Sequence, residues 1–117
     1  MCRLAEAAGA AYVARWRSID FRPLVSSIKK GIRTKGLAFV EVLVQCPTNF
    51  GRYVLKTSQP RDVVNWIKNH TVSRRDAKTL SPEELQGKLI LGEFVHRTDR
   101  SGIVERYQEF LERHKKE

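Results

Sequence analysis

A cysteine in a short loop of distinctive composition is the residue of this sequence best suited to chemistry. Cys46 begins the run Cys46-Pro47-Thr48-Asn49-Phe50-Gly51, which follows an apolar stretch and in which proline and glycine restrict the backbone. A thiol at the end of a strand, inside such a shaped loop, is well placed to bind a metal ion or cluster. A free cysteine is also a common core residue, so both interpretations stand at this point. Since a cluster usually takes four thiolates, any cluster here needs ligands from elsewhere.

Other catalytic constellations are weak. His70, His96 and His114 are scattered along the chain without a partner at ligand spacing, so a solvated or packing role is expected for each. The sequence has no glycine-rich dinucleotide or Walker-type loop and no serine nucleophile elbow. The second cysteine, Cys2, lies where a frayed terminus is expected, and two cysteines do not make a disulfide framework.

The elements that position Cys46 form an alternating pattern of strands and helices. A helix is expected over 3–8, a short buried strand over 11–14, and a helix that Asp20 caps. The apolar face of that helix holds Leu24, Val25, Ile28 and Ile32. The strand over 37–44 is nearly all apolar, as expected for burial on both faces of a parallel sheet. Residues 11–45 therefore predict two parallel strands joined by a right-handed crossover, with Cys46 at the edge where ligands bind.

The second half of the chain continues this pattern. A helix is expected from Pro60, a loop over 71–79, and a short helix whose cap, proline and glutamate are Ser81-Pro82-Glu83-Glu84. A strand over 88–95 and a final helix follow. The apolar stripe of that helix and its end are formed by Ile103, Val104, Tyr107, Phe110, Leu111 and Lys115-Lys116. With about three strands, the expected fold class is α/β with a small, mainly parallel sheet flanked by helices.

Length and hydropathy limit the class of protein. The chain has 117 residues with 41% hydrophobic content, which suits one globular domain or a piece of one. Its longest apolar stretch, Leu37 to Val44, is too short for a membrane span and is interrupted by Glu41. The first residues contain no apolar segment of a secretory signal. We expect a soluble cytoplasmic protein without a membrane partner.

The net charge of +9 suggests an anionic partner and supports an alternative hypothesis, a small basic nucleic-acid-binding module. Basic residues alternate with aromatic ones in Arg15-Trp16-Arg17 and Phe50-Gly51-Arg52-Tyr53, an arrangement that can stack nucleobases. The run Lys29-Lys30 with nearby Arg33 also suits the solvated side of a helix. Residues 81–117 carry 7 basic and 8 acidic groups, which a nucleic-acid interface does not explain.

Several stretches resemble the C-terminal part of the β subunit of 2-oxoacid:ferredoxin oxidoreductases. They are AEAAGAAYVA, SSIKKGIRTKGLAFVEVLVQCPTNFGR, DVVNWIKNHTV and LSPEELQGKLILGEFVHR, in this order. The similarity covers about residues 2–107 and is strongest to the 2-oxoglutarate type, the 2-oxoglutarate synthases. It implies the C-terminal portion of a thiamine-diphosphate-binding fold.

The resemblance implies a chemistry for the parent enzyme. Such enzymes decarboxylate a 2-oxoacid, here 2-oxoglutarate, on thiamine diphosphate with Mg²⁺, and transfer the acyl group to coenzyme A. A [4Fe-4S] cluster passes the electrons to ferredoxin. The family pattern makes the cysteine of the CPT motif a cluster ligand, which carries over to Cys46. Pro47, Thr48 and Asn49 are then expected beside the cluster and cofactor.

The sequence also departs from the family pattern. The Gly-Asp-Gly stretch for Mg²⁺ and diphosphate, the Cys-x-x-Cys pair and a third cysteine are absent, and all would precede Met1. We therefore expect a chain that alone binds no cofactor and is inactive. Its expected partners are the α subunit, the missing N-terminal β portion and ferredoxin, or a second copy in a homodimer. Residues 1–70 are expected to form a strand–helix–strand portion of the thiamine-diphosphate-binding domain with the CPT loop and following helix, and 71–117 a C-terminal extension.

Overall fold

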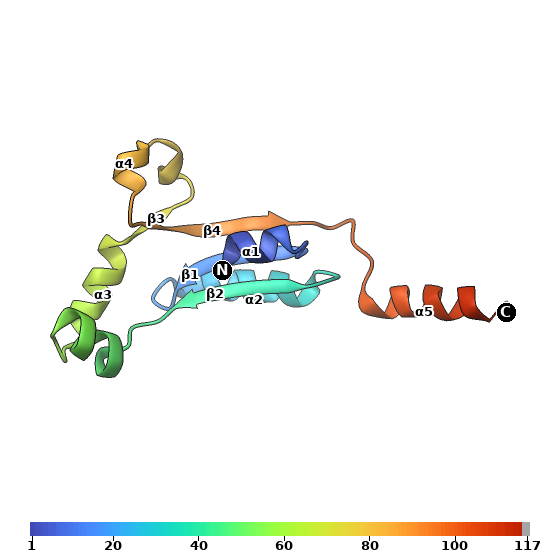
Figure 1. Ribbon diagram of the computed structural model, residues 1–117, viewed down its shortest axis with the longest axis horizontal. Helices are drawn as coiled ribbons and strands as arrows, with labels where there is room; N and C mark the ends of the chain where they lie inside the picture. Colours follow the sequence, from blue (N-terminus) through green and yellow to red (C-terminus); the bar gives the residue numbers. More distant parts are fainter. Residues whose placement is uncertain (116–117) are drawn as a thin grey trace.

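The computed structural model describes residues 1–115, so Lys116, expected at the end of the final helix, lies outside the described residues. Strands and helices alternate along the chain (Figure 1). The elements are α1 (Cys2–Ala7), β1 (Tyr12–Arg17), α2 (Phe21–Arg33), β2 (Ala38–Leu43), η1 (Pro47–Leu55), α3 (Pro60–Asn69), β3 (Thr71–Ser73), η2 (Asp76–Lys78), α4 (Pro82–Leu85), β4 (Leu89–His96) and α5 (Ile103–His114).

The four strands form one sheet in the order β2-β1-β4-β3. β1 and β2 are parallel, with a register that runs from Tyr12 opposite Ala38 to Arg17 opposite Leu43. β3 and β4 are also parallel, whereas β1 and β4 are antiparallel. The expected α/β class with a small, mainly parallel sheet is confirmed. The loop predicted over 71–79 is wrong in part, because its first three residues pair with β4.

The core lies on the two faces of β1. Residues 10–14 are all at most 1% exposed. Val13 packs with Cys2 of α1, while the neighbouring Tyr12 lies beside Gly31 of α2. Because successive side chains of a strand point to opposite faces, α1 and α2 cover opposite sides of the sheet.

β2 is an edge strand, and the expectation that it is buried on both faces is wrong. Val42 is 37% exposed, and Val44, just beyond the strand, is 60% exposed. Its apolar composition therefore reflects one neighbouring strand and partial cover by helices, not a central place in the sheet. An exposed apolar edge of this kind needs a cover to be stable in solution.

The helix α2 turns small residues toward the sheet. Ser27 and Gly31 are its buried residues, and the Trp16 Nε1 donates a 2.7 Å hydrogen bond to Ser27 Oγ. Of the predicted apolar face, Leu24 and Val25 are only half-buried, and Ile28 and Ile32 are exposed. The prediction that this face of the helix packs into the core is therefore wrong. A Cβ at position 31 would lie 3.3 Å from the Cβ of Ala38, so close contact with the sheet selects glycine there.

The C-terminal half departs from a compact shape. The expected Ser81 cap is confirmed, with Glu84 N donating to Ser81 Oγ and Ser81 N to the Glu84 carboxylate. The final helix α5 extends away from the sheet (Figure 1) and leaves its apolar stripe exposed. The radius of gyration is 18.7 Å, against about 13 Å for a compact chain of this length.

Candidate functional site

The Cys46 loop lies at the carboxyl end of β2, beside the end of β1. β1 and β2 are parallel and in register, so the residues that follow both strands meet at one edge of the sheet. Cys46 is the residue before η1, a wide helical segment with Pro47 in its first turn. The prediction of a loop from Pro47 is wrong, because residues 47–55 form the helical segment η1. Wide helical turns of this kind are rare and are frequently found at functional sites.

The Cys46 thiol is exposed and surrounded by hydrogen-bond donors. Its sulfur lies 3.7 Å from the Thr48 hydroxyl oxygen. The backbone N–H of Asn49, with the Thr48 hydroxyl and the N–H of Phe50, lowers the pKa of Cys46 below the ordinary thiol value. The core-residue interpretation of Cys46 is therefore wrong. An accessible thiol with stabilised negative charge is the form that binds metals.

Two contacts hold the helical segment closed. The Gly51 N–H donates to the Cys46 carbonyl (2.9 Å), and the Thr57 N–H donates to the Gly51 carbonyl (3.0 Å). A Cβ at Gly51 would lie only 2.8 Å from the Thr57 carbonyl oxygen and 3.2 Å from Val63 of α3. Only glycine therefore fits this position without a shift of its neighbours. The absence of a side chain at Gly51 lets α3 pack closely against the Cys46 loop.

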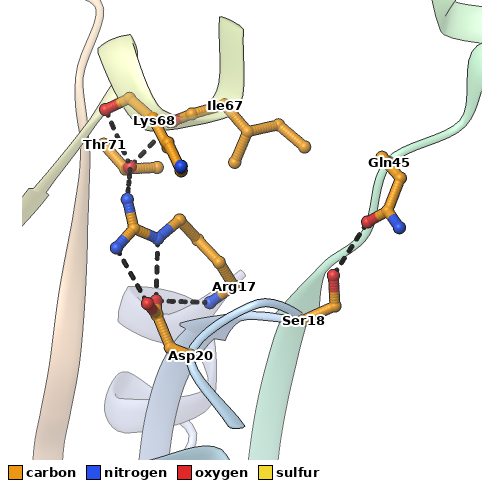
Figure 2. Close-up of polar contacts among 7 residues, drawn as sticks. All are labelled: Arg17, Ser18, Asp20, Gln45, Ile67, Lys68 and Thr71. Atoms are coloured by element: carbon orange, nitrogen blue, oxygen red, sulfur yellow. Dashed lines mark hydrogen bonds and ion pairs between the residues drawn. The ribbon is translucent and has the colours of Figure 1, made fainter. Parts of the chain in front are cut away.

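Polar contacts fasten the loop and α3 to the sheet (Figure 2). The Ser18 hydroxyl, just past β1, lies 2.9 Å from the amide oxygen of Gln45, the residue before Cys46. The Arg17 guanidinium forms a forked pair with Asp20 and reaches Thr71 Oγ1, which donates to the Ile67 carbonyl of α3. Asp20 thus binds Arg17 and makes no side-chain cap on α2, although it occupies the expected cap position.

An apolar groove of about 290 Å³ adjoins the loop on the side of α3. Phe50 and Trp66 meet edge-on with ring centroids 4.7 Å apart, and Trp66 stacks on His70 at 3.9 Å. Val44 completes the wall toward β2. The aromatic contact between η1 and α3 therefore keeps the Cys46 loop in place.

Among the expected site residues, Cys46, Pro47, Thr48 and Asn49 lie together at the start of η1. Cys2 lies elsewhere and is buried, not frayed: its thiol donates to Glu41 (3.2 Å), and burial raises its pKa to about 11. Within residues 1–115, no group of three or more His, Cys, Asp or Glu side chains could hold a metal ion. Of the two free cysteines in the described part of the chain, Cys46 is the exposed one.

Sequence reasoning missed Ser18 and Gln45, which hold the loop. A signal was present, since Ser18 and Gln45 follow two strands that the pattern already predicted to be parallel neighbours. Arg17 was assigned to a basic–aromatic run, but it is paired with Asp20, as Arg15 is with Glu41. Parallel pairing places such residues at one sheet edge, so they could have been grouped with Cys46.

The small, mainly parallel sheet flanked by helices defines an α/β class of domain, and the Cys46 loop lies at the edge where open α/β sheets bind ligands. No protein-family model matches the chain. The chain is 43% identical over all 117 residues to 2-oxoglutarate synthase subunit KorB of Methanocaldococcus jannaschii, covering 43% of that protein. It is 45% identical over 95 residues to the KorB subunit of Methanothermobacter marburgensis, which is 81% of the chain and 33% of that protein.

A further relative is the 2-oxoacid:ferredoxin oxidoreductase subunit beta of Saccharolobus solfataricus, 47% identical over 45 residues. These cover 38% of the chain and 15% of that subunit. The chain belongs to the family of these β subunits, and the expected resemblance is confirmed. It spans about two-fifths of the length of the Methanocaldococcus jannaschii subunit.

Nothing found supports the nucleic-acid-binding alternative. Arg15 and Arg17 form ion pairs, and the Trp16 indole is hydrogen-bonded to Ser27, so this run does not present a free stacking surface. No helix within residues 1–115 has the length and apolar character needed to cross a membrane.

Proposed function

We propose that the chain is the part of a 2-oxoacid:ferredoxin oxidoreductase β subunit that supplies one thiolate ligand of an iron–sulfur cluster. The enzyme would convert a 2-oxoacid, with 2-oxoglutarate as the first candidate, and coenzyme A into acyl-CoA and carbon dioxide. Two electrons would pass to ferredoxin. The observation that carries the proposal is the exposed Cys46 thiol, with its lowered pKa, in a chain that is 43% identical along its length to a 2-oxoglutarate synthase subunit.

In this proposal Cys46 binds a [4Fe-4S] cluster as a thiolate. The N–H groups of Asn49 and Phe50 lower the pKa of the thiol and so favour its charged form, and in a bound cluster they would tune the reduction potential, as hydrogen bonds to cluster sulfurs do. Pro47 shapes the first turn of η1, and Thr48 and Asn49 line the side of the site open to solvent. Cys46 fits a cluster ligand, and the other thiolates come from outside the described residues.

Thiamine diphosphate, when bound, supplies the electron sink for decarboxylation. Its Mg²⁺ ligands would also come from outside the described residues, since these hold no suitable cluster of side chains. The chain alone is proposed to bind no cofactor tightly and to be inactive.

The partners follow from this assignment. They are the α subunit, the rest of a KorB-type β subunit, and ferredoxin, in the cytoplasm. Residues 1–70 would form a strand–helix–strand portion of the thiamine-diphosphate-binding domain, and 71–117 a C-terminal extension. In the structure, β4 of the extension pairs with β1, so the two portions share one sheet.

The test is purification of the enzyme from its source through a tag on this chain. We expect a brown complex that reduces ferredoxin when 2-oxoglutarate and coenzyme A are both present, and more slowly with other 2-oxoacids. A colourless complex without 2-oxoacid-dependent ferredoxin reduction would contradict the proposal.

A further inference from the structure

The Thr48 side chain lies beside the Cys46 sulfur and has no packing role in the core. Its hydroxyl oxygen is 3.7 Å from the sulfur, which is a hydrogen-bond distance for this large atom. Within residues 1–115 the Thr48 hydroxyl makes no other hydrogen bond. Both residues are exposed, so neither side chain fills the interior. The contact is therefore local to the thiol loop.

The start of η1 explains why this hydroxyl stays near the sulfur. The first turn of η1 is closed by the Gly51 N–H, which donates to the Cys46 carbonyl at 2.9 Å. Pro47 separates Cys46 from Thr48, and its ring fixes φ at the point where the contact forms. Threonine is β-branched and has few χ1 rotamers. A closed turn and two stiff residues thus hold the hydroxyl beside the thiol.

Ionisation of Cys46 decides which of the two atoms donates. A neutral thiol carries a proton, so either the sulfur or the Thr48 hydroxyl can be the donor. The thiolate is the form that binds metals, and it has no proton to donate. When Cys46 is a metal ligand, the Thr48 hydroxyl is therefore the donor. Hydrogen bonds to a charged acceptor are also stronger than neutral ones.

A donor at a ligand sulfur acts unequally on the two redox states of a cluster. One-electron reduction adds a negative charge to the cluster and its sulfur atoms. An O–H group with its hydrogen toward the sulfur stabilises the more negative state more strongly, as Coulomb's law requires. Hydrogen bonds to the sulfurs are among the factors that set the reduction potential of such clusters. Removal of the Thr48 hydroxyl should therefore lower the potential.

We propose that Thr48 raises the reduction potential of the iron–sulfur cluster by donating a hydrogen bond from its hydroxyl to the Cys46 sulfur. This inference rests on the proposed function, which makes Cys46 a cluster ligand. The N–H groups of Asn49 and Phe50 also stabilise negative charge on this sulfur, but they belong to the backbone and are kept in every variant below. Thr48 is thus the position where a substitution changes the potential and leaves the ligand in place.

The test measures the midpoint potential of the full enzyme, purified from its source, by electron paramagnetic resonance at controlled potentials. The signal followed is the one that Cys46→Ser abolishes. Thr48→Val replaces the hydroxyl by a methyl group, and we expect a lower midpoint potential with unchanged iron content. The expected change is about tenfold in the equilibrium constant for one-electron reduction, which is about 59 mV. Thr48→Ser keeps the hydroxyl and should keep the wild-type potential.

Asn49→Ala is the matched control, because Asn49 is the next residue, is exposed and acts on the sulfur through its backbone N–H. It should leave the potential unchanged. If iron is retained but Thr48→Val has the wild-type potential, or Asn49→Ala shifts it equally, the inference fails while the proposed function stands.

Thr48→Ala, which also lacks the hydroxyl and adds no bulk, is measured alongside. A lowered potential in this variant supports the inference. Loss of iron from both the valine and the alanine variants would assign Thr48 a structural role and overturn the inference. If Cys46→Ser retains its iron and its signal, the proposed function fails, and the inference fails with it.

Discussion

The two cysteines should differ sharply in reactivity, and the difference can be worked out from their surroundings. Cys46 is exposed and its pKa is below the ordinary 9.0, because N–H groups of η1 face the sulfur. Cys2 is 1% exposed, and burial, with the hydrogen bond to Glu41, raises its pKa to about 11. The thiolate is the species that alkylating reagents attack.

The magnitude follows from ionisation at pH 8. A thiol of pKa 9.0 is about one-tenth ionised at this pH, so Cys46 is ionised to more than that. Cys2 is ionised to only about one part in a thousand. The two ionised fractions thus differ about a hundredfold. A more acidic thiol is also a weaker nucleophile, which reduces this ratio by about tenfold. Burial of Cys2 then widens the difference, so the native rates should differ by well over about tenfold.

The assay is alkylation of the full chain with iodoacetamide at pH 8, with both cysteine peptides followed by mass spectrometry. In concentrated denaturant the two rates should converge to within a few-fold, because both environments are lost. Equal native rates, or faster modification of Cys2, would refute the account of the Cys46 loop.

Two further changes test the supports of the loop. Gly51→Ala would place a Cβ 2.8 Å from the Thr57 carbonyl oxygen, so we expect a loss of about 1–3 kcal/mol in the free energy of unfolding, measured with urea; an unchanged midpoint would contradict the close packing of η1 on α3. Arg17→Gln removes the guanidinium whose hydrogen bonds lower the pKa of Asp20. A carboxyl whose pKa is lowered on folding stabilises the fold at pH values above its unfolded-state pKa, and this stability disappears as pH falls through the folded-state pKa. The variant should therefore lose about 1–3 kcal/mol in the free energy of unfolding at pH 7. Its stability should also depend less on pH below about pH 4. Parallel acid-unfolding curves for the two proteins would count against this pair.

Much of the fold could be predicted from local pattern. The apolar run before Cys46 and the helix between two short apolar segments predicted β1 and β2 as parallel neighbours, and Ser81 with Glu84 predicted the start of α4. These features depend on residues close in sequence. They therefore appear in the pattern itself.

Features that depend on tertiary contacts were missed. The three residues of β3 are too few to show a period, and only their pairing with β4 makes them a strand. The closed turn of η1 depends on Gly51 meeting Thr57, and the orientation of α2 on Gly31 meeting Ala38. Cys46 itself was identified from the sequence. The hydrogen-bond donors that face its sulfur were not, because only the closed turn of η1 brings them there.

The central claim is that Cys46 binds the cluster, and iron analysis of the purified enzyme tests it most directly. Cys46→Ser should lower the iron content by up to about four atoms per chain and abolish the corresponding electron paramagnetic resonance signal of the reduced enzyme. Cys2→Ser, which keeps a hydrogen-bond donor for Glu41, is the control and should retain both. Full iron content and an unchanged signal in Cys46→Ser would contradict the assignment of Cys46 as a cluster ligand.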